Sequence, residues 1–371
     1  MRTSLVLFFL GAMSTSLLAD DSPSGRRTEN VIFVTTDGLR AEEVFQGAEE
    51  LLLSKENGGI EDLDAVRRTY WNDSVEKRRE TLLPFFWKTI ARDGRVFGDK
   101  SKGSLAVVTN KRNFSYPGYS EMFVGFADDR IDSNAKKINP NGNVLEWLDS
   151  RGDFKKRVAV YSSWDVLPEI LRAPKNALIA NAGWEAIKDD SLTDLEKELN
   201  RRILKGPRRW HDCRDDSITF PLALEYLRKH KPKVLYICLG DTDEHAHAGR
   251  YDLYLDAARE FDRSVETLWT TIQRMPEYRG KTSLIVSTDH GRGSGKQGWR
   301  HHGANVQGAD AWWVGVLGPD TTALGSRSNA PKVVQAQIAA TIAGLLGEDY
   351  NAFSPRSAQP LPDALQRVNA P

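Results

Sequence analysis

Histidines gather in one part of this 371-residue chain. Five of its seven histidines fall between residues 245 and 302, most of them close to a carboxylate in the sequence. The candidate metal ligands are Asp37, Asp243, His247, Asp289, His290 and His302. Three carboxylates and three imidazoles suit borderline-hard divalent metals, zinc first, with manganese or iron as alternatives. Two such ions about 3.5–4 Å apart can stabilise the attacking and the leaving oxygen of a phosphoryl transfer.

A hydroxyl that could act as the nucleophile of such a reaction belongs to Ser115. It stands in the segment NFSYPGYSE, shortly after a strand candidate at 107–109. A hydroxyl held between two metal ions loses its proton more easily and can then attack. Taken alone, Ser115 would be interpreted as a turn residue or the N-cap of a helix.

The elements that must position these residues are short apolar strands. Runs rich in β-branched residues at 31–35, 234–239 and 283–287 are followed by Asp37, by the stretch DTDEHAHAG and by Asp289-His290-Gly291. Open α/β sheets bind ligands outside the carboxyl ends of their strands, so residues distant in the chain can meet there. Because strands alternate with helical patterns throughout, the sequence predicts an α/β fold around a mostly parallel sheet.

Three points stay open at this stage. The Asp-x-x-x-His pattern fits Asp241 and His245 as well as Asp243 and His247, and we favour the second register. His301 is an alternative to the neighbouring His302. Ser120, followed by Glu121, is a rival nucleophile.

The start of the chain is typical of an export signal. Arg2 precedes an apolar run at 5–13, and Ala19 offers a small residue for cleavage. We predict a signal peptide at 1–19, a linker at 20–29 and a mature protein that is periplasmic or secreted. The apolar run is shorter than the roughly 20 residues of a transmembrane helix, and no later run is long enough.

Composition excludes several classes of protein. The chain has 51 Lys and Arg against 51 Asp and Glu, so it lacks the basic footprint of a nucleic-acid-binding protein. A hydrophobic content of 40% excludes an intrinsically disordered chain. The two cysteines, Cys213 and Cys238, are too few for a disulfide framework, although a single bridge between them stays open.

In chain order, these motifs resemble the alkaline phosphatase superfamily over roughly residues 30–350. The segment from Ser115 to Gly118, with Gly125 beyond it, is similar to the nucleophile turn of nucleotide pyrophosphatase/phosphodiesterases. Asp289-His290-Gly291 and His302-Gly303 resemble metal motifs of the superfamily. Asp243 and His247, with Gly249, resemble a motif of cofactor-independent phosphoglycerate mutases.

The resemblance implies a three-layer sandwich with a mostly parallel central sheet. We expect one catalytic domain at 30–350, with a helical insertion at about 130–230 that shapes the pocket, and a Pro-rich tail at 351–371. The resemblance also implies two metal sites. The ligands of one are Asp243, His247 and His302, and those of the other are Asp37, Asp289, His290 and the Ser115 oxygen.

Two departures from the family patterns concern the substrate. Gly118 stands where the phosphodiesterases carry an Asn that helps to hold the phosphoryl oxygen. Tyr119 stands where sulfatases need an Arg, which disfavours a sulfatase. Lys111, Arg112 and Arg292 are candidate cations for contacting a phosphate.

The prediction from sequence is an exported dinuclear-metal hydrolase of phosphate esters that acts through a phosphorylated Ser115. Its substrate would be a small-molecule monoester or diester. The alternatives are a sulfatase-like hydrolase, a phosphomutase, or an inactive homologue that binds metal and anions. The sequence leaves open the leaving group, the metal and the oligomeric state.

Overall fold

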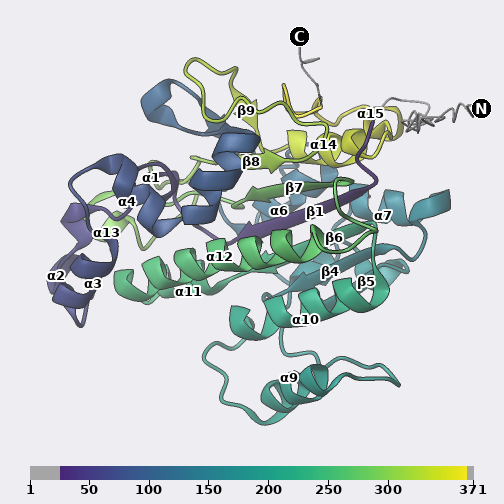
Figure 1. Ribbon diagram of the computed structural model, residues 1–371, viewed down its shortest axis with the longest axis horizontal. Coiled ribbons are helices and arrows are strands. Elements are labelled where there is room, and N and C mark those ends of the chain that lie inside the picture. Colours follow the sequence, from purple (N-terminus) through teal and green to yellow (C-terminus); the bar gives the residue numbers. More distant parts are fainter. Residues whose placement is uncertain (1–25, 366–371) are drawn as a thin grey trace, which may run out of the picture.

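The computed structural model describes residues 26–365 (Figure 1). The predicted signal peptide at 1–19, linker residues 20–25 and tail residues 366–371 lie outside the described residues. Within residues 26–365, no helix combines the length and the apolar composition needed to cross a membrane.

The strands and helices follow the chain in an alternating order. The strands are β1 (Asn30–Thr36), β2 (Arg95–Phe97), β3 (Ala106–Val107), β4 (Val158–Ser162), β5 (Ile179–Ala182), β6 (Val234–Leu239), β7 (Thr282–Ser287), β8 (Val314–Leu317) and β9 (Val333–Val334). The α-helices are α1 (Ala41–Gln46), α2 (Lys55–Gly58), α3 (Leu63–Tyr70), α4 (Val75–Leu82), α5 (Ala91–Asp93), α6 (Ser115–Val124), α7 (Val144–Asp149), α8 (Leu167–Ile170), α9 (Asp194–Lys205), α10 (Asp216–His230), α11 (Asp241–His247), α12 (Tyr251–Ile272), α13 (Gly295–Gly298), α14 (Gln337–Leu345) and α15 (Tyr350–Phe353). Short 3-10 or π-helical turns are η1 (Glu50–Leu52), η2 (Phe86–Ile90), η3 (Lys100–Lys102), η4 (Gly152–Phe154) and η5 (Ala173–Lys175).

Seven strands form the central sheet in the order β2-β8-β7-β1-β6-β4-β5. The five strands from β7 to β5 pair in parallel, and β8 pairs antiparallel with both of its neighbours. The predicted α/β class with a mostly parallel sheet is therefore confirmed. A small second sheet pairs β3 with β9.

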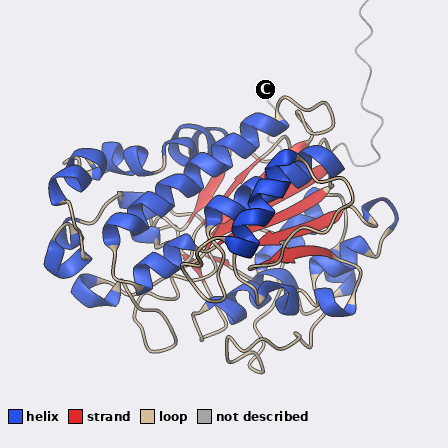
Figure 2. Cartoon of the chain, turned by 90° about the horizontal axis from the view of Figure 1, so that it is seen from below, coloured by secondary structure: helices blue, strands red, loops and turns tan. Residues whose placement is uncertain are grey.

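Helices cover both faces of the sheet, which makes three layers (Figures 1 and 2). On β1, Ile32 and Val34 face the core that includes α1, α4, α10 and α12. Val31 and Phe33 face the opposite core, which includes α6, α7, α8 and α14. This strand is apolar at successive positions because both of its faces are buried, as parallel strands require.

The segment 130–230 contributes more than the helical insertion that we expected. It supplies β4 and β5, which extend the central sheet beyond β6. After β5 the chain forms α9, whose Leu199 and Ile203 are buried and which packs on α10 at the lower end of the molecule (Figure 1). At the other end of the chain, the described part of the Pro-rich tail packs on the domain, since the Leu361 amide donates to Thr341.

The sheet brings three chain-distant loops to one edge. β1 lies between β6 and β7, and Thr35 pairs with Cys238 on one side and Ser287 on the other. Residues that directly follow these three strands therefore emerge side by side at the carboxyl edge. These are the segments that carry most of the candidate ligands.

Helix α6 begins at this edge and packs tightly against the end of β7. A Cβ added to Gly118 would lie 2.5 Å from the backbone oxygen of Asp289, closer than real Cβ contacts allow. The side-chain amide of Gln335 donates to the same carbonyl oxygen at 2.6 Å. The absence of a side chain at position 118 thus sets the distance between the first turn of α6 and Asp289.

We expect Gly118→Ala to lower the free energy of unfolding by about 1–3 kcal/mol, because overpacking against backbone outweighs the better helix propensity of Ala. The measurement is urea unfolding of wild type and variant. Gly152→Ala is the control, since a Cβ there meets nothing within 4 Å. Equal stability of the Gly118 variant and wild type would contradict a tight packing constraint.

Candidate active site

The first ligand group lies where β1 and β7 end. Asp37 follows β1, and Asp289 and His290 follow β7; all three are buried, and their ligand atoms lie within 4.8 Å of one another. The His290 Nε2 atom is 3.3 Å from Asp37 Oδ1 and 3.3 Å from Asp289 Oδ2. Three of the predicted ligands therefore meet at one point.

The hydrogen bonds around this group leave one atom of each residue free. Tyr119 donates to Asp37 Oδ2 at 3.0 Å, and the Gly38 amide donates to Asp289 Oδ1 at 3.0 Å. His290 Nδ1 lies 2.9 Å from the Gly291 carbonyl, which fixes Nδ1 as the donor. The remaining Asp37 Oδ1 and Asp289 Oδ2 are buried without any hydrogen-bond partner in the described structure.

Such unpartnered carboxylate oxygens are costly unless a cation neutralises them. Here they converge with a free imidazole nitrogen, and a backbone carbonyl orients the ring from behind, as is usual for histidine ligands of metals. The donor set of the first group therefore fits a divalent cation.

The pKa shifts have the same origin. Burial, and then the charge of Asp37, raise the pKa of Asp289 well above its ordinary value. For His290, burial lowers the pKa, but the charges of Asp289 and Asp37 outweigh it and raise the pKa to about 9. Both shifts mean that, without a metal ion, the closely spaced carboxylates attract protons in place of another cation.

The second ligand group joins α11 to the loop that carries His302. Asp243 and His247 are four residues apart on α11, so they share one helix face. His247 Nε2 lies 3.3 Å from Asp243 Oδ2 and 3.0 Å from His302 Nε2. His302 Nδ1 faces the Asn113 carbonyl at 3.2 Å, which directs Nε2 toward the group.

The two groups adjoin each other. The rings of His290 and His302 stack with centroids 4.0 Å apart, and Asp243 Oδ1 lies 4.0 Å from His290 Nε2. The six predicted ligand residues thus form two neighbouring triads among the described residues. Both triads could hold a divalent ion.

The alternative register places its residues elsewhere. Asp241 accepts a hydrogen bond from the Asp216 amide, and Asp216 in turn accepts from the amides of Gly240 and Asp241. His245 packs its ring against Trp210 with centroids 5.2 Å apart. Neither Asp241 nor His245 belongs to a triad, so the structure brings together the favoured pair, Asp243 and His247.

The other rivals are also outside the site. His301 is exposed and makes only backbone hydrogen bonds, with Gly293 and Gly298. Ser120 is buried, and its hydroxyl accepts a hydrogen bond from Asn139 Nδ2 at 2.8 Å. Its neighbour Glu121 holds the loop that precedes α6.

Ser115 is the first residue of α6 and is buried beside the first triad. Its Oγ lies 3.5 Å from His290 Nε2. The N-terminus of a helix carries a partial positive charge, which favours anions. In α6 the amides of Tyr116 and Gly118 already donate, to Asn134 and to the Phe114 carbonyl. The preceding loop is fixed by buried Glu121, which accepts hydrogen bonds from the backbone and side chains of Thr109 and Asn110.

Arg292 has other partners than the phosphate that we expected. Its side chain is fully buried, and it donates to the carbonyls of Trp299 at 2.8 Å and Arg300 at 2.6 Å. Its remaining Nη1 contacts Asp243 Oδ1. Burial alone would raise the pKa of Asp243, but Arg292 and His247 hold it well below its ordinary value.

A cavity of about 170 Å³ opens in front of Ser115. It is lined by Asp37, Ser115, Asn134, Trp164, Asp212, Cys213, Cys238, Gly240, Asp243 and Glu244. Neither Lys111 nor Arg112 is among these residues, although both lie on the loop that leads to Ser115. Burial, and then the charge of Asp243, raise the pKa of Glu244 to about 8.

Sequence reasoning missed three residues of this cavity: Asn134, Trp164 and Asp212. They come from irregular segments and belong to no motif, so only the fold reveals them. Asn134 Oδ1 accepts from the Tyr116 amide at 2.9 Å, which ties it to the first turn of α6. Cys213 and Cys238 are both buried and unbridged, and burial raises the pKa of both thiols.

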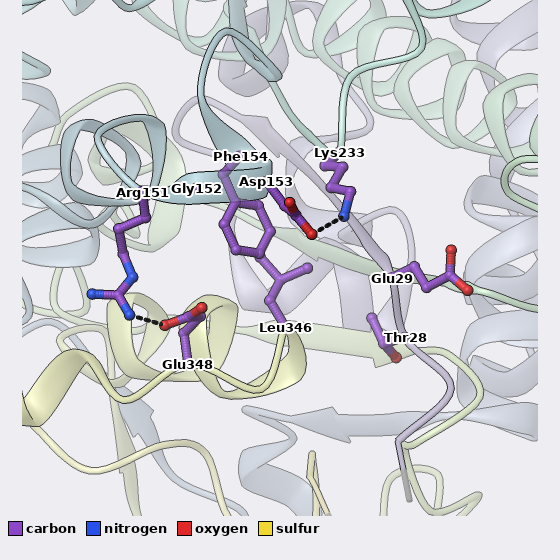
Figure 3. Close-up of a pocket in the computed structure, with 9 residues that line it drawn as sticks. All are labelled: Thr28, Glu29, Arg151, Gly152, Asp153, Phe154, Lys233, Leu346 and Glu348. Carbon is purple, nitrogen blue, oxygen red and sulfur yellow. Dashed lines mark ion pairs between the residues drawn. The ribbon is translucent and has the colours of Figure 1, made fainter. Parts of the chain in front are cut away.

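A second hollow, of about 670 Å³, lies at the opposite, amino edge of the sheet (Figure 3). Its cations are already paired: Arg151 lies 2.7 Å from Glu348, and Lys233 lies 3.9 Å from Asp153 (Figure 3). It contains no ligand triad. Among the described residues, both ligand triads lie at the carboxyl edge.

Comparison with solved structures identifies the fold. The alkaline phosphatase PafA matches with a TM-score of 0.57 and 9% identity, covering 91% of this chain and 99% of that one. A putative sulfatase from Bacteroides thetaiotaomicron matches with a TM-score of 0.56 and 10% identity, covering 92% and 76%. The lipoteichoic acid synthase LtaP from Listeria monocytogenes matches with a TM-score of 0.51 and 9% identity, covering 87% and 73%.

The chain therefore has the fold of the alkaline phosphatase superfamily, and the resemblance found in the sequence is confirmed at this level. No protein-family model matches the chain. Among curated proteins, mouse GPI ethanolamine phosphate transferase 1 (Mus musculus) is 23% identical over 211 residues, which cover 55% of this chain. The match spans only 22% of that relative's length.

We expect Arg292→Gln to lower the free energy of unfolding by about 3 kcal/mol in the presence of a chelator, because Asp243 and two carbonyls lose their partner. Added zinc should restore part of this loss, since a bound cation would neutralise Asp243. Urea unfolding with and without zinc measures both effects.

Arg151→Gln is the matched control for this experiment, because the side chain of Arg151 is 46% exposed and its ion pair with Glu348 is remote from the site. It should change stability by less than about 0.5 kcal/mol. If Arg292→Gln behaves like this control, the guanidinium does not stabilise Asp243.

Proposed function

We propose that this protein is a metal-dependent hydrolase of phosphate esters that uses Ser115 as its nucleophile. The observation that carries the proposal is the position of Ser115 Oγ, at the N-terminus of α6 and 3.5 Å from His290 Nε2. Two adjoining triads of metal-capable residues flank it. We further propose that residues 1–19 direct export to the periplasm or the exterior.

In the first step, the proton of Ser115 passes to solvent as Oγ attacks phosphorus, the new Oγ–P bond forms, and the bond from phosphorus to the ester oxygen breaks. The released alcohol takes a proton from solvent. The amino end of α6, with its partial positive charge, would face the phosphoryl oxygens. Divalent ions, zinc first, held by the two triads would supply Lewis-acid stabilisation of the charge on the attacking and the leaving oxygen.

In the second step, water attacks the phosphorylated serine, the Oγ–P bond breaks, and the proton returns to Ser115. Asp37 and Asp289 carry the negative charge that holds cations here, and Tyr119 keeps Asp37 in place. Burial, and then Asp289 and Asp37, raise the pKa of Tyr119 well above its ordinary value, so its hydroxyl remains a donor.

A transferase is the second candidate, because its first step would be the same. The mouse relative is by name an ethanolamine phosphate transferase. Transfer differs from hydrolysis only in the acceptor of the second step, an alcohol in place of water. Product analysis with and without an added alcohol separates the two.

A sulfatase is disfavoured by the role of Tyr119. This residue occupies the position where the sulfatase pattern requires an Arg, and here it donates to Asp37. A phosphomutase or an inactive metal-binding homologue would retain the two triads. The phosphomutase would return phosphate to the substrate, and the inactive homologue would form no product.

We expect Ser115→Ala to lower turnover of p-nitrophenyl phosphate and of its bis-ester at least about a thousandfold, because the nucleophile is removed. Metal content should stay near the wild-type value, since the triads remain. Turnover assays and elemental analysis of the same sample give both values. Unchanged turnover would remove Ser115 from the mechanism, and equal loss of metal would make its role structural.

Asn134 is expected to donate a hydrogen bond to the phosphoryl group. Its Oδ1 accepts from the Tyr116 amide, so Nδ2 is left as a donor at the cavity wall. Asn134→Ala should lower kcat/KM about ten- to a hundredfold, as the loss of one such donor does elsewhere. Ser133→Ala, in the same loop but not lining the cavity, is the control. Equal kinetics of the two variants would exclude this role.

A further inference from the structure

The wall of the cavity that faces Ser115 has an unusual charge. Beyond the nucleophile and the triads, it is formed by Asn134, Trp164, Asp212, Glu244, the two cysteines and Gly240. No lysine or arginine lines it. A substrate that extends from the phosphate into this space therefore meets carboxylates and an aromatic ring, and no side-chain cation.

Neither wall carboxylate has an ion-pair partner among the described residues. Asp212 Oδ2 accepts from Trp164 Nε1 at 3.3 Å, which couples the carboxylate to the ring. Lys136 is close enough to Asp212 for an electrostatic attraction, but its ion pair is with Asp165, at 2.8 Å. The side chain of Glu244 makes no hydrogen bond or ion pair in the described structure.

These carboxylates do not form a third metal site. A metal ion needs several donor atoms close together, and among the described residues only the two triads meet that condition. Asp212 and Glu244 belong to neither triad. An organic ammonium group is attracted by the face of a tryptophan ring and by carboxylates, and this cavity places Trp164 beside Asp212 and Glu244.

We propose that the substrate is a phosphate ester whose organic part is a small amino alcohol, with its ammonium group held by Trp164, Asp212 and Glu244. The phosphate half of this assignment rests on the proposed function. The cavity is small, about 170 Å³, which favours an amino alcohol of a few carbon atoms. The lack of cations in the wall disfavours substrates with a second anionic group, such as nucleoside polyphosphates.

The recognition of the ammonium group can be tested without catalysis. Calorimetric titration of the Ser115→Ala protein with choline and with 3,3-dimethylbutanol compares a cation with its neutral isostere. Choline should bind about tenfold more tightly, and Trp164→Leu or Asp212→Asn, each combined with Ser115→Ala, should remove the difference. Asp153→Asn, in the hollow at the amino edge, should leave it unchanged. Equal affinities for the two compounds overturn the proposal.

The kinetic form of the test separates this proposal from the proposed function. p-Nitrophenyl phosphorylcholine and p-nitrophenyl 3,3-dimethylbutyl phosphate share a leaving group and differ only in the positive charge. The ratio of their kcat/KM values should be about ten and fall toward one in the Trp164 and Asp212 variants. Turnover of both esters at equal rates overturns the ammonium site and retains the hydrolase. Preferential binding of choline without any turnover retains the ammonium site and removes the hydrolase.

Discussion

Asp37 Oδ1 and Asp289 Oδ2 lie buried at the carboxyl edge of the sheet without a hydrogen-bond donor, and their charge constrains what surrounds them. Every other polar atom of these two carboxylates is occupied: Tyr119 and the Gly38 amide hold the second oxygens. A fold that satisfied all of its own polar groups would place a donor beside each of these two oxygens. Here β1 and β7 are hydrogen-bonded neighbours, so the carboxylates that follow them lie close together.

The rest of the site follows from that edge. Helix α6 can approach Asp289 closely because position 118 is glycine, and this approach places Ser115 beside His290. The loop before α6 is held by Glu121, whose carboxylate is used entirely within the chain. The Ser-Glu pair that made Ser120 a rival nucleophile in the sequence is therefore a structural device.

The strands that carry the site could be predicted from sequence because both faces of the sheet are buried, which produces continuous apolar runs. β6 was predicted at its exact bounds, whereas β5 was missed, because its residues Ile179–Ala182 include two alanines and lie at the sheet edge. The spacing within each Asp-x-x-x-His pair does not separate Asp241 from Asp243, since both pairs are four residues apart; Gly249, two residues after His247, favoured Asp243. Asp241 and Asp243 are two positions apart, so on a helix their side chains point in directions that differ by about 200°. Only tertiary contacts show which of them faces the metal triads.

The two triads differ in charge, and Arg292 is the reason. The first contains two carboxylates and no fixed cation, whereas the single carboxylate of the second, Asp243, already contacts a guanidinium that is anchored on two backbone carbonyls. A divalent ion in the first triad would be neutralised by its ligands, while one in the second would leave a positive charge. In the proposed reaction this charge would attract the phosphate, and Asp212, in the wall of the cavity beyond it, would repel any further anion. For the proposed substrate, the phosphate and the organic part would thus be held by opposite charges within one cavity, and that arrangement would fix the direction in which the ester lies.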